Sequence, residues 1–281
     1  MTTPFDRAGT ARVAIEREGR RVVIEHAWVG ADEPDAPLLV FLHEGLGSVS
    51  LWKGFPQRLC EAIGARGLVY SRPGYGRSSP RPEGERTGPD FMHIEAIEVL
   101  PAVLAALAVD TRAAPPWLFG HSDGGSIALI HAARFPDRVA GLVVAAPHIL
   151  VEPVTLASIR RAHEAWQRGD LRAGLARHHD DPASAFGTWS DAWLDPAFEA
   201  WSIEAELAGI RCPVLAVQGL DDEYGTLEQV RGIARRVPGT VLLELPACGH
   251  SPQRDQPDVL IAATRRIVDT HARAAHRNPL A

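Results

Sequence analysis

The sequence around Ser122 combines residue types that could form an activated nucleophile. A short apolar run, residues 117–119, ends in Gly-His-Ser-Asp-Gly, and an apolar segment with helical character follows at once. Gly-x-Ser-x-Gly between a strand and a helix predicts a nucleophile elbow, a tight turn that strains the serine backbone and exposes its hydroxyl. Gly120 and Gly124 fit this turn because they carry no β-carbon to collide with nearby backbone. Glycine and serine are also common loop residues, so the motif alone leaves an ordinary strand-to-helix loop open.

A serine nucleophile needs two partners, a base that takes its proton and a carboxylate that orients the base. In a parallel sheet, side chains from different strands meet when each follows the carboxyl end of its strand. Ser122, Asp222 and His250 each follow a predicted strand, and they occur in the order serine, aspartate, histidine. We therefore interpret them as nucleophile, orienting acid and general base. Asp221 is the alternative acid, because motifs distinguish adjacent carboxylates poorly.

Strand and helix patterns alternate along the chain around these residues. Continuous apolar runs predict buried strands at residues 38–42, 67–70, 117–119, 141–146, 213–219 and 240–245. Helical spacing is found at residues 52–63, 92–109, 123–135, 227–237 and 258–271, with Pro101 expected to kink or break the second helix. Residues 12–18 and 21–28 alternate apolar and polar and predict a hairpin. The pattern indicates an α/β fold with a mostly parallel sheet and helices on both faces.

The alternation stops between residues 149 and 210, where no strand signal occurs. This segment reads as helical pieces and contains four of the seven tryptophans. We expect a helical cap of residues 149–210 inserted before the strand that bears Asp222, with residues 1–148 and 211–281 forming the core. A small helical subdomain with its own aromatic core is the overlapping alternative. Trp166, Trp189 and Trp193 are candidates for substrate binding.

From about residue 38 to residue 275 the chain resembles a protein of the α/β-hydrolase fold, of the capped serine hydrolase or esterase type. Residues 219–222, Gly-Leu-Asp-Asp, resemble the acid loop of that family, in which the aspartate three residues after the glycine is catalytic. This favours Asp222 over Asp221. Residues 248–252 resemble the histidine loop of the family, and residues 71–78 its glycine-rich loop, although Ser71 stands where aspartate is usual.

The resemblance also implies an oxyanion hole made of backbone N–H groups. One donor should be Asp123, directly after the nucleophile. The other should come from residues 43–47, which occupy the position of the His-Gly-x-x-Gly loop of the family, with Gly45 as the expected donor and Leu46 as the fallback.

Two carboxylates near this expected oxyanion hole need an explanation. Glu44 replaces the usual glycine of its loop, and its charge would oppose an oxyanion unless it points away, for example toward Arg72 or Arg77. The side chain of Asp123 could pair with a cationic substrate, because a subgroup of the family with Ser-Asp-Gly-Gly cleaves amino-acid esters. It could equally form hydrogen bonds within the elbow.

Several other polar residues are interpreted as structural. We expect His121 to be a satisfied structural histidine beneath the site and His43 to order its own loop by hydrogen bonding. Residues 178–181, His-His-Asp-Asp, could suggest a metal cluster, but adjacent residues on a helix do not share a face, which favours a solvated surface of the cap. No metal or cofactor is expected.

Composition narrows the class of protein and its surroundings. A formal net charge of -6 argues against a nucleic-acid partner. No segment has the apolar length needed to span a membrane, and residues 1–7 lack the apolar stretch of a secretory signal. The odd, scattered set Cys60, Cys212 and Cys248 fits neither a disulfide framework nor a zinc site, so a reducing cytoplasm is expected.

These features predict a serine hydrolase that cleaves a small carboxylic ester or thioester through an acyl-enzyme. C–C bond hydrolysis of a diketone-type substrate and amino-acid ester hydrolysis are alternatives within the same fold. A ligand receptor on a hydrolase scaffold that no longer turns over is the alternative from another class. The sequence leaves the oligomeric state open, with a homodimer as one option.

Overall fold

The computed structural model describes residues 9–277, so the stretch on which the expectation about a secretory signal rests lies outside the described residues. Within this range, no helix is both long and apolar enough to cross a membrane.

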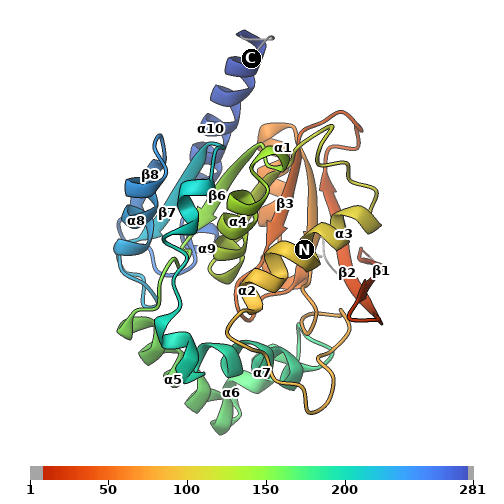
Figure 1. The fold of residues 1–281 in the computed structure, drawn as a ribbon, viewed down its shortest axis with the longest axis vertical. Helices are drawn as coiled ribbons and strands as arrows, with labels where there is room; N and C mark the ends of the chain where they lie inside the picture. The colour runs from red at the N-terminus through yellow and green to blue at the C-terminus, as the bar shows by residue number, and fades with distance from the viewer. Residues whose placement is uncertain (1–8, 278–281) are drawn as a thin grey trace.

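A sheet of eight strands forms the centre of the described chain (Figure 1). Its strands are β1 (Ala11–Arg17), β2 (Arg20–Gly30), β3 (Leu38–Leu42), β4 (Arg66–Tyr70), β5 (Trp117–His121), β6 (Gly141–Ala145), β7 (Val214–Gly219) and β8 (Val241–Leu245). Their order is β1-β2-β4-β3-β5-β6-β7-β8, with β2 antiparallel to both neighbours and all other pairs parallel. Each predicted strand is present with its ends shifted by at most about two residues, and the predicted mostly parallel sheet is confirmed.

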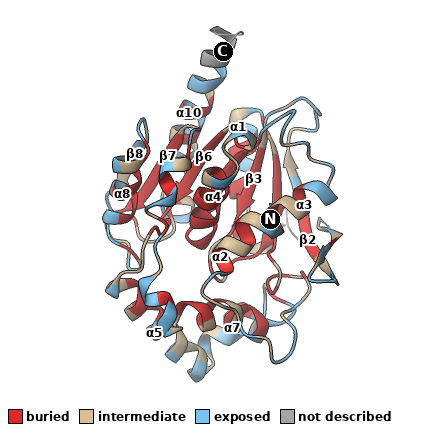
Figure 2. Ribbon diagram, viewed as in Figure 1, coloured by how far each residue is buried: buried red, intermediate tan, exposed pale blue. Residues whose placement is uncertain are grey.

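Apolar side chains point to both faces of the sheet, which is why its strands read as continuous apolar runs. Leu39 and Phe41 of β3 pack in one core layer with α1 (Phe55–Ile63) and α10 (Pro257–Arg277). Val40 and Leu42 pack in the other layer, beneath the helices on the opposite face. Those helices are α2 (Phe91–Ile94), α3 (Leu100–Ala106), α4 (Asp123–Arg134) and α8 (Glu228–Arg236). Figure 2 shows the central strands buried while the outer surfaces of the helices are exposed.

Pro101 changes the helix predicted over residues 92–109 into three pieces. The segment Glu95–Val99 between α2 and α3 has π-helical hydrogen bonding, and α3 starts one residue before the proline. Proline lacks an N–H and cannot donate to the preceding turn, so the chain changes its winding there. The side chain of Glu95, the first residue of this segment, is buried.

The chain between β6 and β7 is helical, and we call residues 149–210 the insertion. It contains α5 (Pro153–Arg168), α6 (Asp170–Leu175), α7 (Pro182–Trp193) and the 3-10 turns Pro196–Ala200 and Glu206–Gly209. Figure 1 shows α5, α6 and α7 grouped beyond one end of the sheet. An antiparallel bridge joins Leu150, near the start of the insertion, to Ser202, which precedes its last turn.

Candidate active site

Ser122 lies in a strained turn between β5 and α4, with φ 53° and ψ -120°. A serine rarely adopts a positive φ unless the surrounding structure enforces it. A β-carbon on Gly120 would lie 2.2 Å from the carbonyl oxygen of Gly124, and one on Gly124 would lie 2.0 Å from that of Leu42. Both positions therefore require glycine, for the steric reason predicted from the sequence.

The structure brings Ser122, His250 and Asp222 together after β5, β8 and β7. The serine Oγ is 3.0 Å from Nε2 of His250, whose Nδ1 lies 2.8 and 2.9 Å from the two carboxylate oxygens of Asp222. An Nδ1–H that donates to the carboxylate leaves Nε2 as the acceptor that a serine hydroxyl needs. Asp222, and not Asp221, contacts the histidine ring.

The protein holds Asp222 in its ionised form. Its oxygens accept hydrogen bonds from the N–H of Tyr224 at 2.8 Å and from the amide of Gln218 at 2.7 Å. Burial alone would raise the pKa of Asp222, but the hydrogen bond and positive charge of His250 outweigh burial and lower this pKa. The carboxylate can therefore orient the imidazole and stabilise its protonated form.

The predicted oxyanion-hole residues line the same cavity as Ser122. This cavity has a volume of about 120 Å³, and Gly45, Leu46 and Asp123 are in its wall. Asp123 is the first residue of α4, where backbone N–H groups lack acceptors within the helix and carry partial positive charge. A β-carbon on Gly45 would lie 2.2 Å from the ring of Trp189, so this loop and α7 approach closely.

Glu44 points to a histidine and not to the arginines considered from the sequence. Its carboxylate lies 3.4 Å from Nδ1 of His121, whereas Arg72 donates to the backbone oxygen of Glu44 at 3.0 Å. Burial would raise the pKa of Glu44, but the hydrogen bond and charge of His121 lower it to about 2. In the wall of the cavity beside Ser122, the Glu44 carboxylate is therefore turned toward His121.

The side chain of Asp123 is engaged by the protein itself and is only 1% exposed. One of its oxygens accepts a hydrogen bond from the indole N–H of Trp193 at 3.1 Å, and the other lies 3.6 Å from the guanidinium of Arg72. A carboxylate already balanced by Arg72 offers little free charge to a cationic substrate. This geometry favours the structural alternative for the side chain of Asp123.

Two of the three candidate tryptophans reach the cavity. Trp189 and Trp193 of α7 line it beside Ser122. Trp166 is not among the lining residues. Its ring stacks on that of Phe186 within the insertion, with the two ring centroids 4.4 Å apart.

Sequence reasoning missed several residues of the cavity wall, and the most notable is His148. Its ring centroid is 5.8 Å from that of His250 and 5.0 Å from that of Trp193. Burial and the charge of His250 lower the pKa of His148 to about 3, so this ring is neutral. Its place just after β6 was an available signal. The other missed lining residues are Thr155, Ile159, Tyr224 and Ser251.

His43 and His121, which lie near the contacts of Ser122, His250 and Asp222, connect the loops of the site. His43 donates from Nδ1 to the backbone oxygen of Glu44 at 2.6 Å and accepts the N–H of Arg72 at Nε2, as expected for a residue that orders its loop. The side chain of His121 is buried, and its Nε2 donates to the backbone oxygen of His250 at 2.7 Å.

The expectation of a solvated surface at residues 178–181 is wrong for His179. This ring is buried, accepts the N–H of Gly76 at 2.8 Å and donates to the carbonyl of Leu46 at 3.1 Å. It therefore ties the insertion to two core loops. Asp181 instead caps α7, and the described residues contain no cluster that could hold a metal ion.

A neighbouring strand compensates for Ser71, which stands where the family has aspartate. Glu25 of β2 accepts the hydroxyl of Ser71 at 2.8 Å and the backbone N–H of Arg77 at 2.9 Å. A carboxylate from β2 thus orders the glycine-rich loop.

Comparison with known proteins defines the family. Residues 39–263 match the family model described as the alpha/beta hydrolase family, and the chain belongs to that family. An esterase of Mycobacterium tuberculosis is 27% identical, over 91% of this chain and 89% of the relative. A 2-hydroxy-6-oxo-6-phenylhexa-2,4-dienoate hydrolase of Burkholderia cepacia is 21% identical, over 81% of this chain and 86% of the relative. The solved structure of a thermophilic esterase of Thermogutta terrifontis superposes with a TM-score of 0.72 at 20% identity, covering 93% of this chain and 98% of that one.

Proposed function

We propose that this protein is a serine hydrolase that cleaves a small carboxylic ester through an acyl-enzyme intermediate. The observation that carries the proposal is the chain of contacts from Ser122 through His250 to Asp222, built on a strained turn in a member of a hydrolase family. The esterase relative that matches nearly the whole chain supports ester substrates.

The geometry suits a two-step acyl transfer. The Oγ of Ser122 attacks the acyl carbon while Nε2 of His250 takes the serine proton. The oxyanion that forms faces the backbone N–H of Asp123 and of the Gly45–Leu46 loop. His250 then protonates the departing alcohol, and the acyl group remains on Ser122. Water attacks the acyl-enzyme as His250 takes its proton, which releases the acid and restores the serine.

The cavity supports a small substrate held under a cap. Its volume of about 120 Å³ suits a short acyl or alcohol group, and Ile159, Trp189 and Trp193 of the insertion supply apolar wall. We therefore assign residues 149–210 as a cap over a core of residues 1–148 and 211–281. A thioester would fit the same mechanism. The three cysteines are free thiols, which supports the cytoplasm as the proposed location.

A second candidate is C–C bond hydrolysis of a diketone-type substrate. It draws support from the Burkholderia cepacia relative, whose name describes a hydrolase of an oxo-phenyl-dienoate. Amino-acid ester hydrolysis has less support, because the carboxylate of Asp123 is already paired with Arg72.

The test compares wild type with Ser122→Ala on a panel of p-nitrophenyl esters, thioesters and diketone-type substrates. Wild type should turn over short-chain esters, and the variant should lose at least about 10³-fold in kcat because the nucleophile is gone. A fluorophosphonate probe should label wild type at Ser122 and leave the variant unlabelled, with circular dichroism showing that both are folded. Unchanged turnover in the variant would refute the mechanism. Wild type that neither labels nor turns over would favour the receptor alternative.

A further inference from the structure

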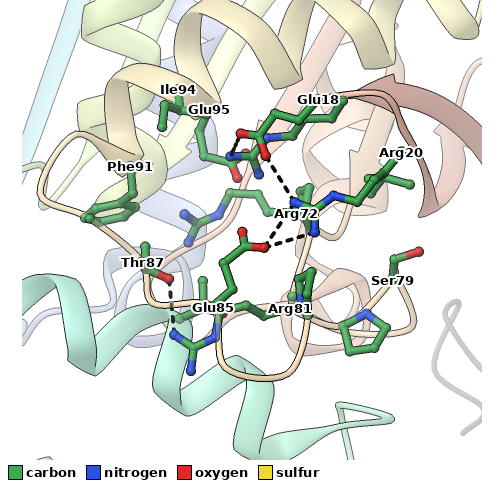
Figure 3. A pocket seen from close by; sticks show the side chains of 18 of the residues that line it. Glu18, Arg20, Arg72, Ser79, Arg81, Glu85, Thr87, Phe91, Ile94 and Glu95 are labelled. Carbon is green, nitrogen blue, oxygen red and sulfur yellow. Dashed lines mark hydrogen bonds and ion pairs between the residues drawn. The ribbon is translucent and has the colours of Figure 1, made fainter.

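A second cavity of about 330 Å³ lies on the other side of the Arg72–Asp123 pair from Ser122. The β1–β2 turn, the loops after β4, the start of α2 and Thr188 of α7 surround it. Figure 3 shows Arg72 and Glu85 near its centre, with Phe91 on one side, Arg20 on the other, and Glu95 beside Ile94 and Glu18. The cavity shares none of its lining residues with the catalytic cavity.

Charged atoms without partners gather at the inner end of this cavity. The side chain of Arg72 is 1% exposed and Glu95 is 7% exposed. Within the described residues, no hydrogen-bond partner is present for Nε of Arg72, Nε of Arg17 or Oε2 of Glu95. Buried polar atoms in folded proteins nearly always have partners, and leaving one unpaired costs about 1–3 kcal/mol. Three such atoms around one cavity therefore point to a ligand.

Two arginines at the mouth of the cavity have close carboxylate partners, whereas the carboxylate pairs of the arginines at the inner end are longer. Arg20 bonds to Glu18 and Glu85 at 3.0 Å, and Arg81 bonds to Asp191 at 2.7 Å. At the inner end, Arg72 donates to the backbone oxygen of Glu44 at 3.0 Å, and its carboxylate pair with Asp123 is longer, at 3.6 Å. Arg17 pairs with Glu18 at 3.6 Å. Among the described residues, Glu95 forms no ion pair with either guanidinium.

We propose that this cavity binds a small organic carboxylate that carries a hydroxyl or amino group next to the carboxylate. The guanidinium groups of Arg17 and Arg72 bind the carboxylate, which matches the planar fork of arginine. Glu95 accepts the neighbouring hydroxyl or amino group. Phe91 and Ile94 supply apolar wall for the rest of the ligand. A phosphate dianion fits less well, because its second charge would face the carboxylate of Glu95. The volume lies at the small end of the range for ligand sites.

Arg72 connects this site with the candidate active site. Its guanidinium bonds to the backbone oxygen of Glu44 and lies beside the carboxylate of Asp123, and both residues are in the wall of the catalytic cavity. A carboxylate that draws on the same guanidinium changes this pairing. Occupancy should therefore alter ester turnover, a consequence that rests on the proposed function, whereas binding itself does not.

Calorimetric titration with mandelate tests the site, since mandelate combines a carboxylate, an adjacent hydroxyl and an apolar ring. Mandelamide, which lacks the charge, and inorganic phosphate serve as comparison ligands. Wild type should bind mandelate at least about tenfold more tightly than either. Arg17→Gln should weaken mandelate binding at least about tenfold, because it removes one arm of the carboxylate site.

Arg12→Gln is the matched control, since it removes the same charge from an exposed position on the same strand, away from the cavity. It should change the affinity for mandelate less than about twofold. Absence of mandelate binding to wild type, or equal weakening by both arginine variants, would overturn the site, and tighter binding of phosphate would overturn its carboxylate preference. Ser122→Ala should bind mandelate as wild type does, which separates this test from that of the catalytic proposal. Binding with no effect on turnover would overturn the coupling through Arg72.

Discussion

Two adjacent carboxylates follow β7, and the backbone turn decides which of them faces the histidine. Asp222 accepts the N–H of Tyr224 and the amide of Gln218, and these bonds fix its carboxylate beneath Nδ1 of His250. The N–H of Asp221 instead bonds to the carbonyl of Cys248. The orientation of the imidazole therefore depends on one residue of the pair.

Asp222→Asn should lower kcat for a p-nitrophenyl ester about 10⁴-fold, because an amide donor at Nδ1 favours the wrong imidazole tautomer. Asp221→Asn makes the same change one residue earlier, and its kcat for the same ester should stay within about twofold of the wild-type value. Steady-state kinetics of both variants on one ester provide the measurement. Equal losses in the two variants would mean that Asp222 does not have the proposed role.

At the scale of elements, β3, the turn at Ser122 and the start of α4 pack so closely that Gly124 has no room for a side chain. A β-carbon added to Gly124 would meet the carbonyl oxygen of Leu42, at the end of β3, at 2.0 Å. Backbone on both sides prevents easy relaxation, so close packing of these elements and the strained φ of Ser122 depend on each other.

Gly124→Ala should lower the free energy of unfolding by at least about 3 kcal/mol, since backbone must move to admit the methyl group. Gly174→Ala in α6 is the control, because its β-carbon would meet nothing closer than 4.0 Å. It should stabilise the protein by about 0.5–1 kcal/mol through helix propensity. Urea denaturation measures both, and a similar small effect at the two positions would contradict this account.

The elements, and the meeting of three side chains that follow strands, could be predicted from sequence because their signals are local. Apolar runs mark the strands, and Ser122, Asp222 and His250 each follow one of them. The contacts that could not be predicted join segments far apart in the chain. Glu25 of β2 accepts the hydroxyl of Ser71, which stands where the family has aspartate. His179 of the insertion accepts the N–H of Gly76 in a core loop. Such partners depend on strand order and on the docking of helices, which no short pattern encodes.

For the whole molecule, the buried charge of Glu95 links folding to pH. Burial raises the pKa of Glu95 to about 7, although the nearby charges of Arg72 and Arg17 oppose this and Asp123 reinforces it. An acid whose pKa is raised on folding binds its proton more tightly in the folded state. Its stabilising contribution is complete below about pH 4.5, the ordinary value, and is lost as the pH rises toward 7.

Glu95→Gln should remove this dependence, because a neutral amide carries no charge to bury. Relative to wild type, the variant should gain roughly 3 kcal/mol in the free energy of unfolding between pH 4.5 and pH 7.5. Urea denaturation of the two proteins at both pH values gives the difference directly. A difference that does not change with pH would show that Glu95 does not titrate in this window.

Because the Leu150–Ser202 bridge closes the insertion at its base, the ends of the long connection from β6 to β7 are already held together. Residues between Leu150 and Ser202 that do not bond to the core, unlike His179 and Trp193, could be deleted, added or exchanged without altering the spacing of β5, β7 and β8. Loop-closure entropy grows only slowly with length, so such changes cost the rest of the fold little. Changes confined to this segment would therefore alter the wall above the cavity while the strands beneath it stay in place.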